Sequence, residues 1–277
     1  DSKKPIKNIE LSSYLKDQLK KNYKLNVTHL NSYLECPLCF YYKTILRIPS
    51  IKDKYAALGT AVHYSLSHLF NVLGQQGKLI SKKDLLTFYE QALKREDLSQ
   101  KNFKEALHRG TESLSEYYDH YQSSFSGNCV MDYDCTPRHL FVDDTPITGK
   151  IDKIEIQKTT RDGKPAANLV DFKTGNPDTK SKDMQPGGSY HNQIVFYKIL
   201  TDSDPEFPYH VSTATIDFIQ KSKYKKTFIR RDFEFRKDDI DIVKKLIKEI
   251  YEKIINLDFN HIGEECKDEQ DLHGLLE

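Results

Sequence analysis

The chain has 277 residues, of which 38% are hydrophobic and 30% are charged, and its formal net charge is +1. This length allows one large domain or two small ones with a buried core, and the sequence contains no run of 18 apolar residues that would span a membrane. Because the net charge is close to zero, any attraction to nucleic acid must come from local basic patches. The candidates are Lys16–Lys24, the pair Lys150 and Lys153, and above all residues 221–231, although such runs are more often solvated faces.

The first 25 residues are polar and rich in lysine, and the sequence begins Asp1-Ser2 without a methionine or a signal peptide. We therefore expect residues 1–25 to be a linker or tail from an upstream region, with one helix around Leu11–Lys21. Residues 26–277 then form the main domain.

Five cysteines are present, and their odd number and scattered spacing argue against a disulfide framework and for a reducing compartment. Cys36 and Cys39 form a single C-x-x-C without a second pair, whereas a structural metal site normally needs four ligands. We expect these residues to be buried thiols that act as small hydrophobic groups.

The part of the chain from about residue 26 to 125 has helical periodicity. A first helix is predicted from Thr28, as N-cap, to shortly before Pro49, and a second covers residues 55–74 and stops at Gly74. Two more helices are predicted over residues 82–96 and 101–124.

From about residue 126 to 277, strand and helix patterns alternate. Strands are predicted at residues 129–134, 138–143, 147–157, 169–174, 211–220 and 226–235, and helices at residues 190–201 and 237–256. Residues 158–168 are predicted to be a long polar loop. The pattern as a whole predicts an α/β protein with a central sheet, helices on its flanks and a helical insertion.

The residues that could bind an ion or take part in catalysis lie on two neighbouring strands. Asp152 shares a strand face with Ile154 and Ile156, where a carboxylate is costly unless it is paired or binds a cation. Asp171 and Lys173 share a face of the next strand, so the two acids could reach one ion. Oxygen ligands suit Mg²⁺ or Mn²⁺, and a nearby lysine could offset charge developing on a phosphate. Each acid alone could equally be an exposed edge residue or half of a surface ion pair.

Taken together, "GKIDKIEI" and "DFKTG" resemble the paired motifs of the PD-(D/E)XK nuclease superfamily, with Ile151-Asp152 in place of its leading Pro-Asp. The resemblance is nearest to the RecB-type nuclease domains that end bacterial helicase–nuclease proteins, and it runs from about residue 26 to 268. Four other stretches support it: "LNSYLECPLCFYY", "LGTAVHYSLSHLF", "HNQIVFYKIL" and "LDFNHIGEECKDEQ". It implies a restriction-endonuclease-like core, with a central mixed β-sheet flanked by helices, and an N-terminal helical region.

The resemblance also assigns roles to residues. It implies that His63, Asp152, Asp171 and the backbone carbonyl of Phe172 bind the metal. The implied catalytic set is Asp152, Asp171, Lys173, Gln193 and Tyr197, with Gln193 and Tyr197 on one helix face beside the site. Taken alone, His63 is more often a satisfied core or surface residue, and only Gly59 one turn earlier and the later motifs favour a ligand.

Some relatives hold an iron–sulfur cluster with one early and three late cysteines. Cys36 and Cys266 would fill two of these places, but no cysteine follows Cys266. We therefore expect no iron–sulfur cluster, and Mg²⁺ or Mn²⁺ as the cofactor.

These observations predict a metal-dependent deoxyribonuclease domain that acts in the bacterial cytoplasm, with no membrane partner. Its substrate would be single-stranded DNA or strand ends, and it would act as an exonuclease in DNA repair or recombination. No G-x-x-x-x-G-K-[ST] motif is present, so a motor would come from a helicase domain or subunit. The first alternative is a catalytically inactive nuclease-fold module that binds DNA or braces a helicase complex. The second is a plain α/β protein whose Asp171–Lys173 pair is a surface ion pair.

Overall fold

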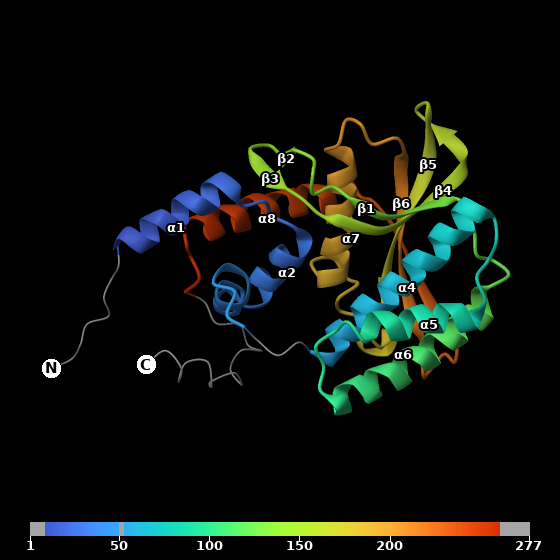
Figure 1. The fold of residues 1–277 in the computed structure, drawn as a ribbon. Helices are drawn as coiled ribbons and strands as arrows, with labels where there is room; N and C mark the ends of the chain where they lie inside the picture. The colour runs from blue at the N-terminus through green and yellow to red at the C-terminus, as the bar shows by residue number, and fades with distance from the viewer. Residues whose placement is uncertain (1–8, 50–52, 261–277) are drawn as a thin grey trace.

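A five-stranded sheet lies at the centre of the computed structural model, which describes residues 9–49 and 53–260 (Figure 1). The strand order is β1-β4-β5-β6-β7, in which β5 and β6 are parallel and the other neighbours antiparallel. The strands are β1 (Cys129–Asp134), β4 (Lys150–Arg161), β5 (Lys164–Lys173), β6 (His210–Lys221) and β7 (Phe228–Glu234). Two short strands, β2 (Leu140–Val142) and β3 (Thr145–Ile147), form a separate hairpin. The predicted mixed sheet is thereby confirmed.

Helices cover both faces of this sheet (Figure 1). One layer contains α4 (Lys54–Gln76), α5 (Lys82–Leu93) and α6 (Gln100–Tyr121), and the other contains α7 (Ser189–Asp202) and α8 (Lys237–Ile255). Two further helices, α1 (Ile9–Asn22) and α2 (Val27–Glu35), contact α8, and α2 also contacts α7. The predicted N-terminal helical region and flanking helices are therefore confirmed.

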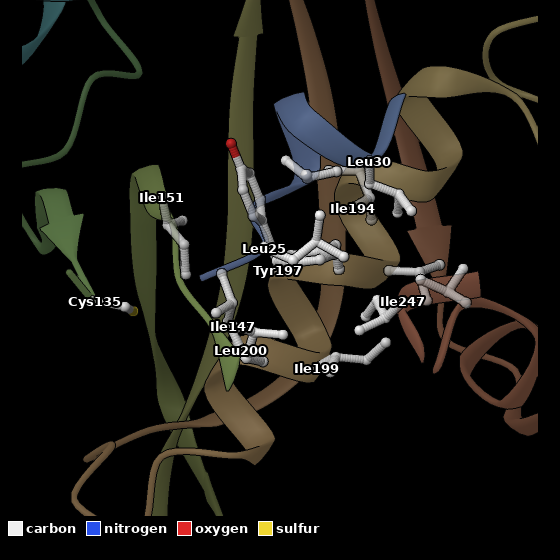
Figure 2. Packing of buried hydrophobic residues seen from close by; sticks show 14 of the residues in the cluster. Leu25, Leu30, Cys135, Ile147, Ile151, Ile194, Tyr197, Ile199, Leu200 and Ile247 are labelled. Carbon is white, nitrogen blue, oxygen red and sulfur yellow. The ribbon is translucent and has the colours of Figure 1, made fainter. Parts of the chain in front are cut away.

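The sheet separates two hydrophobic clusters because alternate side chains of its strands point to opposite faces. Leu169 packs in the cluster under α7, whereas Val170 and Phe172 pack in the cluster under α4–α6. Figure 2 shows the first cluster, in which the ring of Tyr197 lies among aliphatic side chains while its hydroxyl points away from them. This leaves the face that carries Asp171 directed toward α7.

Residues 9–25 contain α1, which confirms the helix predicted around Leu11–Lys21, and they end in a contact with the hydrophobic core. Leu25 is fully buried, its N–H donates to the carbonyl of Pro146, and its own carbonyl accepts from the N–H of Thr148. The next helix starts one residue before Thr28, because the side chain of Asn26 caps α2 by accepting from the N–H of His29. Asn26 is therefore the N-cap, and the prediction of Thr28 was wrong.

The first predicted helix is broken into three pieces. After α2 come α3 (Pro37–Phe40) and a π-helical turn, η1 (Tyr41–Ile45). Cys36 and Cys39 flank the start of α3 and take part in disulfide bonding, so they are not the thiols that were expected. Cys129 and Cys135 are free. Cys266 lies outside the described residues, as does all of the C-terminal motif after residue 260, and the expected lack of an iron–sulfur cluster stays a prediction.

Two boundaries differ from the sequence prediction for identifiable reasons. Residues 158–168, predicted as a long loop, mostly extend β4 and β5, because Asp162 and Gly163 adopt positive φ angles of 52° and 75°. Two such residues form the tight turn that joins twisted hairpin strands. Likewise α4 passes Gly74 and ends at Gly77, whose φ of 65° is the left-handed conformation typical of a helix C-terminus.

No helix in the part of the chain that the structure describes is both long and apolar enough to cross a bilayer.

Candidate active site

The two acids of the predicted site lie where the β4–β5 ladder ends. Lys153 pairs with Val170 in this antiparallel ladder, so Asp152 and Asp171 occupy the next facing positions, just beyond the last pair. Oδ2 of Asp152 accepts a hydrogen bond of 3.1 Å from the N–H of Phe172. The register thus brings together the two carboxylates that the sequence placed on adjoining strands.

His63 reaches the same point from α4. A Cβ placed on Gly59 would lie 3.5 Å from Oγ1 of Thr174, so this face of α4 packs directly against the end of β5. One turn later, Nδ1 of His63 lies 3.2 Å from Oδ2 of Asp152, and its ring stands edge-on to Phe172 at 6.3 Å. The Gly-x-x-x-His spacing therefore brings an imidazole to the acid pair.

The amide of Gln193 joins the second acid to the lysine. Its Nε2 donates to Oδ1 of Asp171 at 2.7 Å, and its Oε1 accepts from Nζ of Lys173 at 2.6 Å. Tyr197 lies one turn further along α7, where its hydroxyl donates to the same Oδ1 at 3.2 Å. Gln193 and Tyr197, the two polar residues that the i, i+4 spacing places on one face of α7, thus both contact the site.

Asp171 carries one oxygen with unused capacity. Its side chain is 1% exposed, and its Oδ2 lies 2.7 Å from Nζ of Lys173, which is ion-pair distance. Within the described part of the chain, the structure gives this atom no partner other than Lys173. The two charges therefore attract, while the lone pairs of Oδ2 stay available for another electrophile.

Burial and charge perturb the titration of all three candidate metal-binding side chains. Burial alone would lower the pKa of His63, but the charge and hydrogen bond of Asp152 outweigh it and raise that pKa above 6.5. Burial would raise the pKa of Asp152, yet the neighbouring charge of His63 holds it below 3.8. The pKa of Asp171 is raised by burial, partly offset by Lys173, and the charge of Asp152 raises it further. The two acids therefore interact electrostatically, as expected for one site.

The donor set fits a divalent cation, although the side chains are paired with one another in this arrangement. Among residues 9–49 and 53–260, no group of three His, Cys, Asp or Glu side chains is arranged to hold a metal ion. The half-buried carboxylate of Asp152 and the buried one of Asp171 are instead compensated separately, the first by His63 and the second by Lys173. However, two carboxylates supply oxygen ligands of the kind that Mg²⁺ or Mn²⁺ prefers, and the Oδ2 of Asp171 has no partner besides Lys173 among the described residues.

Comparison with known protein families agrees with this geometry. A family model described as the PD-(D/E)XK nuclease superfamily matches residues 24–268. The chain belongs to this superfamily. The match covers both helical layers and the whole sheet, and the described part of the chain has the restriction-endonuclease-like arrangement of a mixed sheet flanked by helices. A search of curated proteins found no significant match.

One residue of the candidate site was missed in the sequence. The ring of Tyr190 lies 4.6 Å from Nζ of Lys173 and 5.7 Å from Nζ of Lys180, so it forms a cation–π contact with each amine. A signal was available, because Tyr190, Gln193 and Tyr197 follow one another at intervals of three and four residues on one helix face.

A cavity of about 450 Å³ opens between α2 and the first turn of α7. Asn31, Lys180, Asp183 and Ser189 are among the residues that line it. Lys180 therefore lies both at this cavity and against the ring of Tyr190.

The basic patches expected from the sequence differ in how they are used. Lys150 pairs with Asp132 at 2.8 Å, while Lys153 is 6% exposed and pairs with Glu155 at 2.9 Å. These two lysines therefore do not form an open basic surface. Two candidates remain: Lys16–Lys24, most of which lies on α1, and residues 221–231, which include the turn between β6 and β7.

Proposed function

We propose that this chain is a Mg²⁺- or Mn²⁺-dependent deoxyribonuclease of the RecB type that acts with a helicase domain or subunit in DNA repair or recombination. The observation that carries the proposal is the bridge formed by Gln193 between Asp171 and Lys173. A surface ion pair would not need a half-buried amide to fix the distance and orientation of its two charges. The RecB-type assignment is supported by the same amide and by the Gly59/His63 pair on α4.

Some of the site residues would bind an ion, and Lys173 would stabilise charge on the phosphate. His63, Asp152, Asp171 and the carbonyl of Phe172 would hold the divalent ion, which when bound polarises a phosphodiester and acidifies a water molecule. Lys173 presents its ammonium group at the edge of the acid pair, with 17% of its side chain exposed. From there it can donate to a non-bridging phosphate oxygen and offset the charge that develops on it.

Gln193 and Tyr197 are positioning residues in this scheme. Both donate to Oδ1 of Asp171, which directs the other oxygen, Oδ2, toward Lys173. Asp171 and Tyr197 are buried and Gln193 and Lys173 are half-buried, so packing holds this arrangement before substrate arrives.

In the decisive experiment, end-labelled single-stranded or duplex DNA is incubated with the protein in three separate conditions: Mg²⁺, Mn²⁺ or a chelator. We expect cutting only with a divalent ion, and its loss in both Asp171→Ala and Lys173→Ala. The matched control is the exposed pair Lys82 and Asp119, 2.8 Å apart on α5 and α6. Alanine at either control position should leave cutting unchanged, because exposed pairs contribute little to stability. Full cutting by Asp171→Ala or Lys173→Ala would refute the catalytic roles of these two residues.

A second candidate is a nuclease-fold module that binds DNA or braces a helicase complex without cutting. It is favoured by the separate compensation of the two acids within the described part of the chain, where no three side chains are arranged for a metal. DNA binding that never leads to cutting with either ion would select it. Exonuclease action on strand ends and a location in the bacterial cytoplasm stay predictions.

A further inference from the structure

The turn between β6 and β7 carries an unusual concentration of positive charge. Residues 221–231 contain six lysine and arginine side chains and no acidic one. Lys223, Lys225 and Lys226 are exposed, and within the described ranges 9–49 and 53–260 none of their side-chain amines forms an ion pair. By contrast Lys221 lies 3.4 Å from Glu116. We call residues 221–227 the basic turn.

An aromatic ring stands at the tip of the basic turn. Tyr224 is 85% exposed, the largest value for any large hydrophobic side chain in the described part of the chain. The next are Tyr14 at 62% and Ile242 at 56%. A ring held in solvent among lysines matches the combination that binds single strands, in which bases stack on aromatic side chains and the backbone follows a basic surface.

The basic turn is held in one conformation by its own hydrogen bonds. The N–H of Ser222 donates to the carbonyl of Thr227, and the N–H of Lys226 donates to the carbonyl of Ser222, both at 2.9 Å. The N–H of Lys225 donates to Oγ of Ser222, a residue that is 2% exposed. Tyr224 is therefore presented on an ordered support, which lowers the entropy that binding must remove.

The same turn lies at the edge of the sheet that holds the candidate active site. Strands β5 and β6 are parallel, and Lys173 pairs with Phe218. Strand β6 therefore continues past the position of Lys173 and ends at Lys221, where the basic turn begins. Asp178, five residues after Lys173, accepts from Oγ of Ser222 at 2.5 Å and from the N–H of Lys223 at 2.7 Å. The segment that leaves the site is thus fastened to the basic turn.

Positive groups follow one another from the site to the turn. Lys173 and Lys180 lie against the same ring, that of Tyr190, and Lys180 is two residues from Asp178. Although Nζ of Lys180 also lies 3.4 Å from Oδ2 of Asp183, this sequence of amines can contact successive phosphates of a strand whose scissile bond lies at Lys173.

We infer that the basic turn is a binding surface for single-stranded DNA, in which Tyr224 stacks on an unpaired base and the three exposed lysines contact phosphates. This inference rests on the proposed nuclease function of the same site. A duplex hides its base faces, so the ring distinguishes single strands from duplex, whereas lysines alone would not.

The test measures binding and cutting separately. Fluorescence anisotropy in a chelator gives the affinity for an oligothymidylate of about 20 nucleotides, which can stack on one ring or several. Tyr224→Ala should weaken this binding by about tenfold and leave duplex binding unchanged, while Tyr224→Phe keeps the ring and should bind as wild type. Changing the three exposed lysines to serine should lower the slope of log affinity against log salt by about 2.

Controls of the same residue types lie on other elements. Tyr14→Ala on α1, and Lys244→Ser with Lys248→Ser on α8, remove an exposed ring and exposed lysines away from the basic turn. These variants should bind oligothymidylate as wild type does. A loss as large as that of the turn variants would show unspecific attraction and overturn the inference.

A small chromogenic diester, bis(p-nitrophenyl) phosphate, separates this inference from the proposed function because it cannot reach the turn. If wild type cleaves it and the turn variants cleave it equally but bind single strands less well, both ideas are supported. If wild type and the turn variants bind oligothymidylate equally, the basic turn is not a single-strand binding surface and the nuclease proposal stands. If binding depends on Tyr224 but no diester is ever cut, the surface is supported and the nuclease proposal fails.

Discussion

Removal of the Gln193 side chain should slow phosphodiester cleavage without weakening substrate binding. The amide makes hydrogen bonds of 2.6 Å to Lys173 and 2.7 Å to Asp171, and both partners are charged. Hydrogen bonds to charged groups contribute about 1.5–3 kcal/mol each. After Gln193→Ala, Tyr197 still donates to Oδ1 of Asp171 and Lys173 still faces Oδ2, so the net loss corresponds to one such bond. That loss equals a fall in kcat of about 10- to 150-fold.

The assay is steady-state cleavage of a quenched fluorescent single strand at saturating Mg²⁺, analysed as kcat and KM. Because Gln193 acts through Lys173 and Asp171, KM should stay within about twofold of wild type, as for an interaction that is not made with substrate. Gln122→Ala, at the exposed end of α6, is the control and should leave both constants unchanged. A change confined to KM, or a kcat within about threefold of wild type, would show that the bridge does not position the site.

Three other perturbations test the structure around the site. Burial raises the pKa of Asp217 to about 6 from 3.8, so the folded state keeps this proton to higher pH than the unfolded state, and stability falls as pH rises through this range. The full fall is about 3 kcal/mol, and urea unfolding of Asp217→Asn between about pH 4 and 7.5 should lack it. A Cβ on Gly110 would lie 2.1 Å from the buried ring of Tyr89, so Gly110→Ala should lower the free energy of unfolding by about 1–3 kcal/mol. Loss of the ring in Tyr190→Ala removes the cation–π contact with Lys173 and should reduce kcat by about 2- to 30-fold, whereas Tyr190→Phe should not.

Each of these has a clear contrary result. Equal pH dependence of wild type and Asp217→Asn would mean that the carboxyl group titrates normally when folded. Glu112→Ala, on the exposed side of α6, controls for Gly110→Ala, and equal stability of the two would show that Tyr89 can move aside. An unchanged kcat in Tyr190→Ala would remove this ring from the catalytic environment of Lys173.

Local patterns predicted the strands that carry the acids because alternation fixes faces within a strand. Asp171 and Lys173 were placed on one face and Val170 and Phe172 on the other, and the two hydrophobic clusters confirm this. The same holds for α7, where the i, i+4 spacing of Gln193 and Tyr197 sets their common direction. These inferences needed only the geometry of one element.

Features that depend on contacts between distant segments were not predictable in this way. Gly74 looked like the end of α4, but it is a packing position: a Cβ there would lie 2.8 Å from the carbonyl oxygen of Gly127. Lys153 looked like part of a basic patch, yet the cluster under α4 buries it, with its Nζ 3.7 Å from the ring centre of Phe70. In each case a neighbour more than 50 residues away decides the environment, and no local pattern encodes that neighbour.

The candidate site depends on both helical layers, since neither layer alone can complete it. The acids lie at the end of the β4–β5 ladder, where one strand face turns toward α7 and the other toward α4. His63 approaches Asp152 from the α4 layer, and Gln193 approaches Asp171 from the α7 layer. The compensation of each buried carboxylate therefore depends on a different packing interface. A fragment containing only the β4–β5 hairpin would keep the acids and Lys173 but lose the imidazole and the amide. Its acids would then return toward ordinary solvated behaviour, because desolvation and fixed partners are what perturb them.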